Sequence, residues 1–261
     1  MEISLRGKKA LVGGSSQGIG KAIGQQLAAS GASVTLMARS GNKMKDIISE
    51  LPTDQGQKHQ FLEVDFTNFN SYQEIIGGYF RDNSVDILVN NTQGPASGGA
   101  MDKHVEDYQT AFDLLFKTVV FTTELALKGM IAQKYGRIIN IASVSVKEPL
   151  SYLTLSNSIR AAVTTWAKTL AADVGHYGIT VNSTLTGYFD TERLKGLNGA
   201  KAKSFGIPIE EVNQQMLANV PVCRFGDPKE YGYLVAFLAS EQASFITGTN
   251  IPIDGGMLKS L

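Results

Sequence analysis

A short glycine-containing turn near the start of the chain has the residue types and spacing of a phosphate-binding site. Gly14-Ser15-Ser16-Gln17-Gly18-Ile19-Gly20 directly follows the apolar run Ala10-Leu11-Val12 and precedes an amphipathic segment. Glycines in such a strand-to-helix turn let the backbone approach a diphosphate closely, and the positive end of the helix favours its negative charge. The turn therefore predicts a dinucleotide site, although glycines at a strand end also serve packing alone.

The end of the next apolar run, Ala38-Arg39-Ser40, carries a basic residue at a position that selects between cofactors. A carboxylate there binds the adenosine ribose hydroxyls of NAD, whereas a guanidinium accommodates the 2′-phosphate of NADP. Arg39 therefore favours NADP(H), with NAD(H) as the alternative cofactor. The competing interpretation is that Arg39 is a solvated surface residue.

Short apolar segments alternate with longer amphipathic segments along the chain, which predicts βαβ units in an α/β fold. The expected strands cover residues 10–12, 33–38, 60–64, 86–89, 137–141, 180–182 and 250–253. The expected helices cover residues 21–29, 42–51, 71–80, 105–133, 156–174 and 229–240. About seven strands with helices between them fit a Rossmann-type, doubly wound parallel sheet with helices on both faces, formed by a single domain over residues 1–261.

The alternation stops between residues 191 and 220, where polar and small residues surround two modest helical patterns. This composition suits a mobile cover over a substrate better than a core element. Apolar side chains such as Tyr188, Phe205, Ile207 and Met216 either line a pocket or pack the cover against the core, and packing is the preferred interpretation for most of them.

The composition argues against several classes of protein. The 24 basic and 24 acidic residues balance, so nothing in the overall charge attracts nucleic acid or an anionic membrane. One cysteine, Cys223, and three scattered histidines provide neither an internal disulfide nor a metal site. The first residues lack the apolar stretch of a signal peptide, and no run approaches the roughly 20 uncharged residues of a membrane span. We therefore expect a cytoplasmic protein without a metal.

A series of motifs makes the chain resemble the short-chain dehydrogenase/reductase family over nearly its whole length. Besides the glycine turn, the motifs after successive strands are Asp65, Asn90-Asn91-Thr92-Gln93-Gly94, Ser143, Gly187-Tyr188-Phe189-Asp190-Thr191 and Ile253-Asp254-Gly255-Gly256. The branch that it is most similar to is the β-ketoacyl-carrier-protein reductases, in particular their atypical members. The resemblance implies a nicotinamide cofactor, a small-molecule or acyl substrate, and a homodimer or homotetramer built on the long helix and the C-terminal strand.

The resemblance also implies a set of cofactor-binding residues. The phosphates would be lined by Gly14, Ser16, Gln17, Gly18, Ile19 and Gly20, and the adenine would lie between Asp65 and Phe66. Asn91 and Gly94 would lie along the body of the cofactor, and Phe189 and Thr191 would contact the carboxamide. Arg39 joins them through the 2′-phosphate, and Arg160 through the nicotinamide ribose.

Three of the four catalytic groups typical of the family are replaced in this chain. Members usually carry a tyrosine as proton donor, a lysine four residues later, a serine about thirteen residues earlier and an asparagine on the preceding long helix. Ser143 keeps the serine position, with a helix cap as its alternative role. At the other three positions stand Ser156, Arg160 and Leu115. An aliphatic hydroxyl is far less acidic than a phenol with its pKa of about 10, and arginine stays protonated, so Ser143, Ser156 and Arg160 imply an atypical proton donor.

Two tyrosines are candidate substitutes for the missing acid. Tyr152 lies four residues before Ser156 and would share a helix face with it if the helix began that early. Tyr188 follows Gly187 near the expected nicotinamide. Ordinary packing is the preferred interpretation for both.

Two functions fit these residues. The first is an NADP(H)-dependent oxidoreductase that reduces a ketone or β-ketoacyl group, or oxidises the corresponding secondary alcohol. The second is a nucleotide-binding protein with little or no turnover that acts as a sensor or partner subunit. The expected cover favours the enzyme, because a cover implies that something is enclosed.

Overall fold

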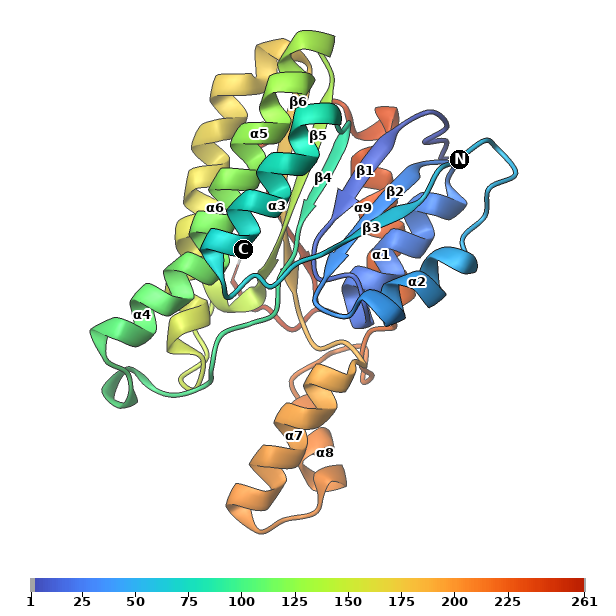
Figure 1. The fold of residues 1–261 in the computed structure, drawn as a ribbon. Helices are drawn as coiled ribbons and strands as arrows, with labels where there is room; N and C mark the ends of the chain where they lie inside the picture. The colour runs from blue at the N-terminus through green and yellow to red at the C-terminus, as the bar shows by residue number, and fades with distance from the viewer. Residues whose placement is uncertain (1–2, 261) are drawn as a thin grey trace.

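The computed structural model describes residues 3–260, which form a parallel seven-stranded sheet with helices on both faces (Figure 1). The strands are β1 (Lys9–Val12), β2 (Ser33–Ala38), β3 (Gln60–Glu63), β4 (Ile87–Asn90), β5 (Gly136–Ser143), β6 (Ile179–Thr186) and β7 (Asn250–Ile253). Their order is β3-β2-β1-β4-β5-β6-β7, so the chain winds outward from β1, returns to the middle at β4 and winds outward again. The predicted doubly wound sheet is confirmed.

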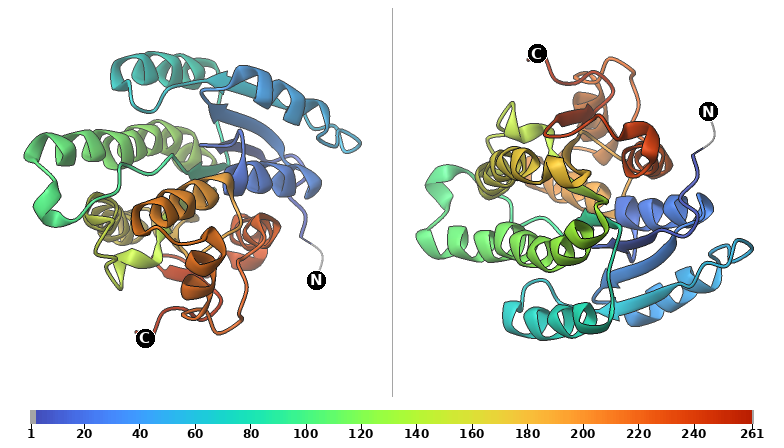
Figure 2. Two further views of the ribbon diagram at one scale, coloured as in Figure 1. Left: turned by 90° about the horizontal axis from the view of Figure 1, so that it is seen from below. Right: turned by 90° about the horizontal axis from the view of Figure 1, so that it is seen from above.

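The helices form two layers (Figure 2). One face is covered by α1 (Gly18–Ala29), α2 (Gly41–Ser49) and α9 (Pro228–Ala239). The other is covered by α3 (Phe69–Asp82), α5 (Thr118–Gln133) and α6 (Thr154–Val174), with α4 (Val105–Phe112) leading into α5 through a π-helical turn, Asp113–Lys117. None of the helices within residues 3–260 has both the length and the hydrophobicity of a membrane-crossing segment.

The strands are apolar because helices bury them on both sides. Along β1, Ala10 and Val12 belong to the core under α1 and α9, whereas Leu11 points to the opposite core under α3 and α5. β1 and β4 are paired neighbours, and the connections from their carboxyl ends lead to helices on opposite faces of the sheet, α1 and α5. Such a switch point is where doubly wound sheets bind ligands.

Two central strands are longer than the sequence predicts. We expected 137–141 and 180–182, but β5 extends over Gly136–Ser143 and β6 over Ile179–Thr186. The error has a physical cause, since the second half of β6 is polar but buried. Thr184 is fully buried, and its hydroxyl lies 2.6 Å from the hydroxyl of Tyr231 on α9. This hydrogen bond replaces the one that the threonine would make with water.

The two helical patterns expected within residues 191–220 are confirmed as two regular helices. Helices α7 (Glu192–Phe205) and α8 (Ile209–Leu217) form a hairpin that projects from the body (Figure 1). The hairpin has a small core of its own, in which Ala202, Val212 and Met216 are buried and Ile207 packs against them. The preferred packing role of Ile207 and Met216 is therefore confirmed, while Phe205 is exposed.

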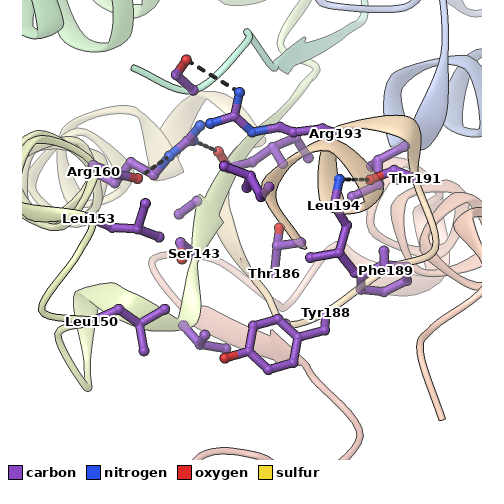
Figure 3. A pocket seen from close by; sticks show the side chains of 18 of the residues that line it. Ser143, Leu150, Leu153, Arg160, Thr186, Tyr188, Phe189, Thr191, Arg193 and Leu194 are labelled. Atoms are coloured by element: carbon purple, nitrogen blue, oxygen red, sulfur yellow. Dashed lines mark hydrogen bonds between the residues drawn. The ribbon is translucent and has the colours of Figure 1, made fainter. Parts of the chain in front are cut away.

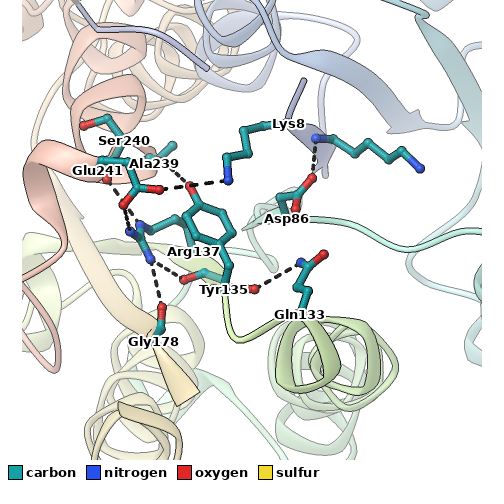
Figure 4. A network of polar contacts seen from close by, with 11 residues as sticks. Lys8, Asp86, Gln133, Tyr135, Arg137, Gly178, Ala239, Ser240 and Glu241 are labelled. Carbon is teal, nitrogen blue, oxygen red and sulfur yellow. Dashed lines mark hydrogen bonds and ion pairs between the residues drawn. The ribbon is translucent and has the colours of Figure 1, made fainter. Parts of the chain in front are cut away.

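A polar network closes the opposite end of the sheet, at the amino ends of the strands (Figure 4). Arg137 near the start of β5 is 2% exposed, and its guanidinium donates to the carbonyl oxygens of Gly136, Gly178 and Ser240. Its Nη2 lies 3.3 Å from the carboxylate of Glu241. This arginine is thus fully provided with acceptors inside the fold.

Candidate active site

The glycine turn between β1 and α1 forms an anion-binding cradle. Gly14 and Gly18 both have φ of +56°, a left-handed conformation that glycine adopts without a steric penalty. A Cβ atom at Gly20 would overlap the carbonyl oxygen of Gly14. Helix α1 begins at Gly18 with neither a capping side chain nor an acidic residue in its first turn, so its first N–H groups remain available to a phosphate.

Two neighbouring residues hold the cradle in place. Asn91, just after β4, donates its Nδ2 amide to the carbonyl oxygens of Gly13 and Gly14 at 3.0 and 3.4 Å. Ser15 is fully buried and pairs with Met37 on β2, donating its N–H at 3.1 Å and accepting the N–H of Met37 at 2.9 Å. The backbone geometry of the turn is therefore fixed by strands on both sides of it.

A groove of about 560 Å³ runs over this cradle. The predicted cofactor residues that line it are Gly14, Ser16, Gln17, Gly18, Ile19, Gly20, Arg39, Phe66, Asn91 and Thr191. The groove also contains Lys43, which the sequence analysis missed. Lys43 lies in the first turn of α2, four residues after Arg39. Two cations so close together at the start of a helix are a sequence signal for a phosphate site.

Four predicted cofactor residues lie elsewhere. Gly94, Phe189 and Arg160 line a second cavity that adjoins the groove. Asp65 lines neither, and its carboxylate instead accepts the N–H and hydroxyl of Thr67 at 2.9 and 2.7 Å. These hydrogen bonds, with a smaller contribution from Arg39, lower the pKa of Asp65. The two cavities share Ile19, Asn91, Thr92, Thr191 and Arg193 in their walls.

The second cavity, of about 210 Å³, brings the three candidate catalytic residues together (Figure 3). Ser143 ends β5, and its Oγ accepts the N–H of Ser145 at 3.2 Å, so the capping role is present. Ser156 lies in the first turn of α6 with Arg160 one turn later. Arg160 donates its Nε to the hydroxyl oxygen of Ser156 at 3.3 Å and its Nη1 to the carbonyl oxygen of Ile141.

These hydrogen bonds determine which donors and charges the cavity can offer to a ligand. Within residues 3–260, the oxygens of Ser143 and Ser156 each accept one N–H and neither hydroxyl donates to another residue, so both hydroxyl protons can be donated toward a ligand. Burial, and secondarily the nearby Arg193, lower the pKa of Arg160 to about 10, although the charge of Tyr231 acts in the opposite direction. The arrangement can thus stabilise negative charge on an oxygen atom in the cavity.

The position expected to hold an asparagine is apolar and lies in the π-helical turn. Leu115 is buried there and lines a small pocket together with Arg160 and Asn140. The Oδ1 atom of Asn140 accepts the amide of Asn90 at 2.8 Å, but its Nδ2 has no partner in the described part of the chain. Leucine cannot hydrogen bond to this amide, so a polar relay through this side chain is excluded.

The two candidate tyrosines are weak acids in this structure. Helix α6 begins at Thr154, so Tyr152 lies in the preceding turn, and the condition under which it would share a helix face with Ser156 is not met. Tyr152 and Tyr188 hydrogen bond to each other, and both line the cavity. Burial raises the pKa of Tyr152, and burial with the nearby Tyr152 raises the pKa of Tyr188 to about 12. Among residues 3–260, no cation contributes to the pKa of either phenol, so nothing there lowers it toward neutral pH.

Arg193, in the first turn of α7, is a site residue that the sequence analysis missed. Its Nη1 donates to the carbonyl oxygen of Gly94 at 3.5 Å, and its guanidinium lies so close to Gly94 that a Cβ there would displace it. Arg193 was missed because it lies in the segment interpreted as a cover, where a lone arginine is most often a solvated surface residue.

Comparisons with known proteins agree with this geometry. A family model described as enoyl-(acyl carrier protein) reductase matches residues 14–258. The chain is 31% identical over 262 residues to the 3-oxoacyl-[acyl-carrier-protein] reductase FabG of Aquifex aeolicus, covering 98% of this chain and all of that protein. It is 34% identical over 256 residues to the oxidoreductase UcpA of Salmonella typhimurium, covering 97% and 95%.

Two solved structures are similar over almost the entire chain. L-sorbose reductase from Gluconobacter frateurii, determined with NADPH and L-sorbose, superposes with a TM-score of 0.92 at 30% identity and full coverage of both chains. YwfH, an NADPH-dependent reductase of bacilysin biosynthesis, superposes with a TM-score of 0.91 at 28% identity, covering 97% of this chain and 99% of the other.

Proposed function

The chain belongs to the short-chain dehydrogenase/reductase family, and from this premise we propose that it is an NADP(H)-dependent oxidoreductase for a ketone or β-ketoacyl group or the corresponding secondary alcohol. The observation that carries the proposal is the junction of the two cavities. The groove over the glycine cradle opens at Ile19, Asn91 and Thr191 into the cavity that holds Ser143, Ser156 and Arg160.

The residues present fit the dinucleotide. The cradle excludes a Cβ at Gly20 and offers uncapped N–H groups to the diphosphate, while Arg39 and Lys43 provide two cations for a 2′-phosphate. Arg160 can donate to the hydroxyls of the nicotinamide ribose, in place of the family lysine. When bound, NADPH supplies the hydride that a carbonyl carbon accepts.

The side chains of the second cavity bind the carbonyl oxygen of the substrate. Ser143 and Ser156 each donate a hydroxyl proton in a hydrogen bond to that oxygen, which orients the carbonyl and stabilises the developing alkoxide. Arg160 holds the oxygen of Ser156 and adds its positive charge. The proton that completes the alcohol then comes from water or through Ser156, since both neighbouring phenols have raised pKa values.

The first test is a fluorescence titration of the purified protein with NADPH and, separately, with NADH. We expect micromolar binding that clearly favours NADPH, followed by NADPH oxidation in a screen of ketones and β-ketoacyl compounds. Failure to bind either nucleotide would overturn the proposal.

The replaced tyrosine and lysine favour a second candidate function, a nucleotide-binding sensor or partner subunit with little turnover. The double variant Ser156→Tyr with Arg160→Lys separates the two. Activity that appears only in the double variant would support the second function. Existing activity that falls in the variant would support an enzyme with its own proton route.

Three further features belong to the proposal. Residues 191–220 form the cover over the substrate, and in support Thr191 and Arg193 lie in the wall of the cavity. We place the enzyme in the cytoplasm as a homodimer or homotetramer, which fits the position of β7 at an edge of the sheet. Cell fractionation and sedimentation of the purified protein test the location and the assembly.

A further inference from the structure

Two arginines face the substrate cavity without a counter-ion. Arg160 reaches in from α6 and Arg193 from α7, and Figure 3 shows their guanidinium groups approaching each other across the top of the cavity. Their recorded acceptors are one hydroxyl and two carbonyl oxygens. Among residues 3–260, no aspartate or glutamate lines this cavity or lies within ion-pair distance of either arginine.

Two other arginines of this chain each form an ion pair with a carboxylate. Arg137 donates to three carbonyl oxygens and pairs with the carboxylate of Glu241 (Figure 4). Arg224, on the surface after α8, pairs with Glu230 at 2.6 Å. Arg160 and Arg193 differ from both because each lacks a carboxylate and each faces a cavity.

The rest of the polar lining does not neutralise this charge. The hydroxyls of Ser143 and Ser156 each accept one N–H and keep their own proton for donation, and neither carries a negative charge. Burial lowers the pKa of Arg160, and the nearby Arg193 lowers it further. An anion that enters the cavity would therefore stabilise the charge of Arg160.

We propose that the substrate carries an anionic group, a carboxylate in its simplest form, which Arg193 binds with help from Arg160 while the carbonyl faces Ser143 and Ser156. This inference rests on the proposed function, whose substrate class it narrows to keto acids or the corresponding hydroxy acids. A guanidinium binds a carboxylate through two parallel N–H donors, which fixes orientation as well as charge.

The diphosphate of the cofactor is the other source of anionic oxygen, because Arg193 also lines the groove. The structure favours the substrate for two reasons. The glycine cradle and the start of α1 already serve the diphosphate, and Arg160, which faces Arg193, lines the substrate cavity and not the groove.

The test compares acids with their neutral esters in the full-length protein. Phenylpyruvate, acetoacetate and levulinate, each with its methyl ester, are titrated calorimetrically into the protein with and without NADP⁺, and their NADPH-dependent reduction is measured in parallel. We expect at least one acid to bind at least about tenfold more tightly than its ester, since a hydrogen-bonded charge pair has this magnitude. Equal binding of every acid and its ester would overturn the proposal.

Variants assign the effect to Arg193. Arg193→Met keeps a long side chain and should abolish the preference for the acid. Because Arg193 also lies in the wall of the groove, NADPH affinity is measured alongside, and its loss should be smaller than the loss of this preference. Arg193→Lys should restore part of the preference. The matched control, Lys203→Met, removes a charge from the same helix away from the cavity and should change neither.

Two outcomes separate the inference from the proposed function. A tenfold loss of NADPH affinity in Arg193→Met with an unchanged ratio of acid to ester would assign the arginine to the diphosphate and overturn the anionic substrate. Binding that prefers the acid without any turnover would support the anionic subsite and count against the oxidoreductase.

Discussion

The nucleotide half and the substrate half of the site are built from different parts of the chain. Backbone dominates the nucleotide half, where glycine conformations, helix N–H groups and the amide of Asn91 form the cradle. Side chains dominate the substrate half, where Ser143, Ser156 and Arg160 depend on what the helix and strand present. The first half carries the glycine motif of the family, whereas the family resemblance implies that Ser156, Arg160 and Leu115 replace three of the four usual catalytic groups in the second.

This difference shows which parts of such a site can change independently. A glycine in the cradle is tied to the fold, since a Cβ at Gly20 would overlap the backbone of the turn. By contrast, α6 packs on the sheet through Ala167, Ala171 and Val174, so its first turn points at the cavity whichever side chains it carries. Catalytic chemistry can therefore be replaced without loss of the cofactor site.

The largest expected effect is on the substrate half. Ser143→Ala removes a hydroxyl that donates to the carbonyl oxygen, and loss of one such donor lowers kcat by about 100-fold or more. The affinity for NADPH should not change, because Ser143 does not line the groove. Steady-state kinetics and nucleotide titration measure the two quantities, with Ser158→Ala on the exposed side of α6 as a control. An active Ser143→Ala enzyme would remove this residue from the chemistry.

A smaller effect is expected from the cradle. Gly20→Ala forces a Cβ against the carbonyl of Gly14, and backbone strain of 1–3 kcal/mol should weaken NADPH by roughly 10-fold to 100-fold. The control is Gly77→Ala on α3, where a Cβ meets nothing within 4 Å. It should leave binding unchanged and raise stability by about 0.5–1 kcal/mol. Unchanged NADPH binding in Gly20→Ala would contradict the role of the cradle.

The sequence predicted the nucleotide half well because its signal is local. A glycine turn between an apolar strand and a helix requires only a few adjacent residues to be recognised. The substrate half was predicted only through the resemblance, and Arg193 was missed because it reaches Gly94 from a helix that is distant in sequence. The length of β6 was underestimated since buried threonines there are satisfied by Tyr231, a long-range contact without a sequence pattern.

A third effect sharpens the nucleotide half further. Arg39→Asp replaces a donor to the 2′-phosphate with a repelling charge, and it should weaken NADPH by about 30-fold because charged hydrogen bonds contribute about 1.5–3 kcal/mol. NADH lacks this phosphate and should bind as before or more tightly. Parallel fluorescence titrations check the ratio of the two affinities, and Lys45→Asp, on the helix α2 that follows Arg39 but outside the groove, is the control. Equal weakening of both nucleotides would show that Arg39 does not recognise the phosphate.

The smallest expected effect comes from removing an ion pair that lies outside both halves of the site, which should leave the binding properties of both halves unchanged. Arg224 binds Glu230, whose carboxylate also accepts the N–H of Asp227 at the start of α9, and these contacts lower the pKa of Glu230 from 4.5 to about 2. Because the folded state has the lower pKa, the contacts stabilise the protein above pH 4.5, and this stabilisation is lost as the pH falls toward 2.

Glu230→Gln should therefore reduce the free energy of unfolding at neutral pH by less than about 1 kcal/mol, since the ion pair is partly exposed to solvent. Urea denaturation of both proteins over this pH range should show the difference shrinking below pH 4.5. NADPH affinity and the preference for acids over esters should stay constant, because Glu230 lines neither cavity. A change in either would mean that α9 transmits strain to the cradle through α1, and that the two halves of the site are not independent of the scaffold.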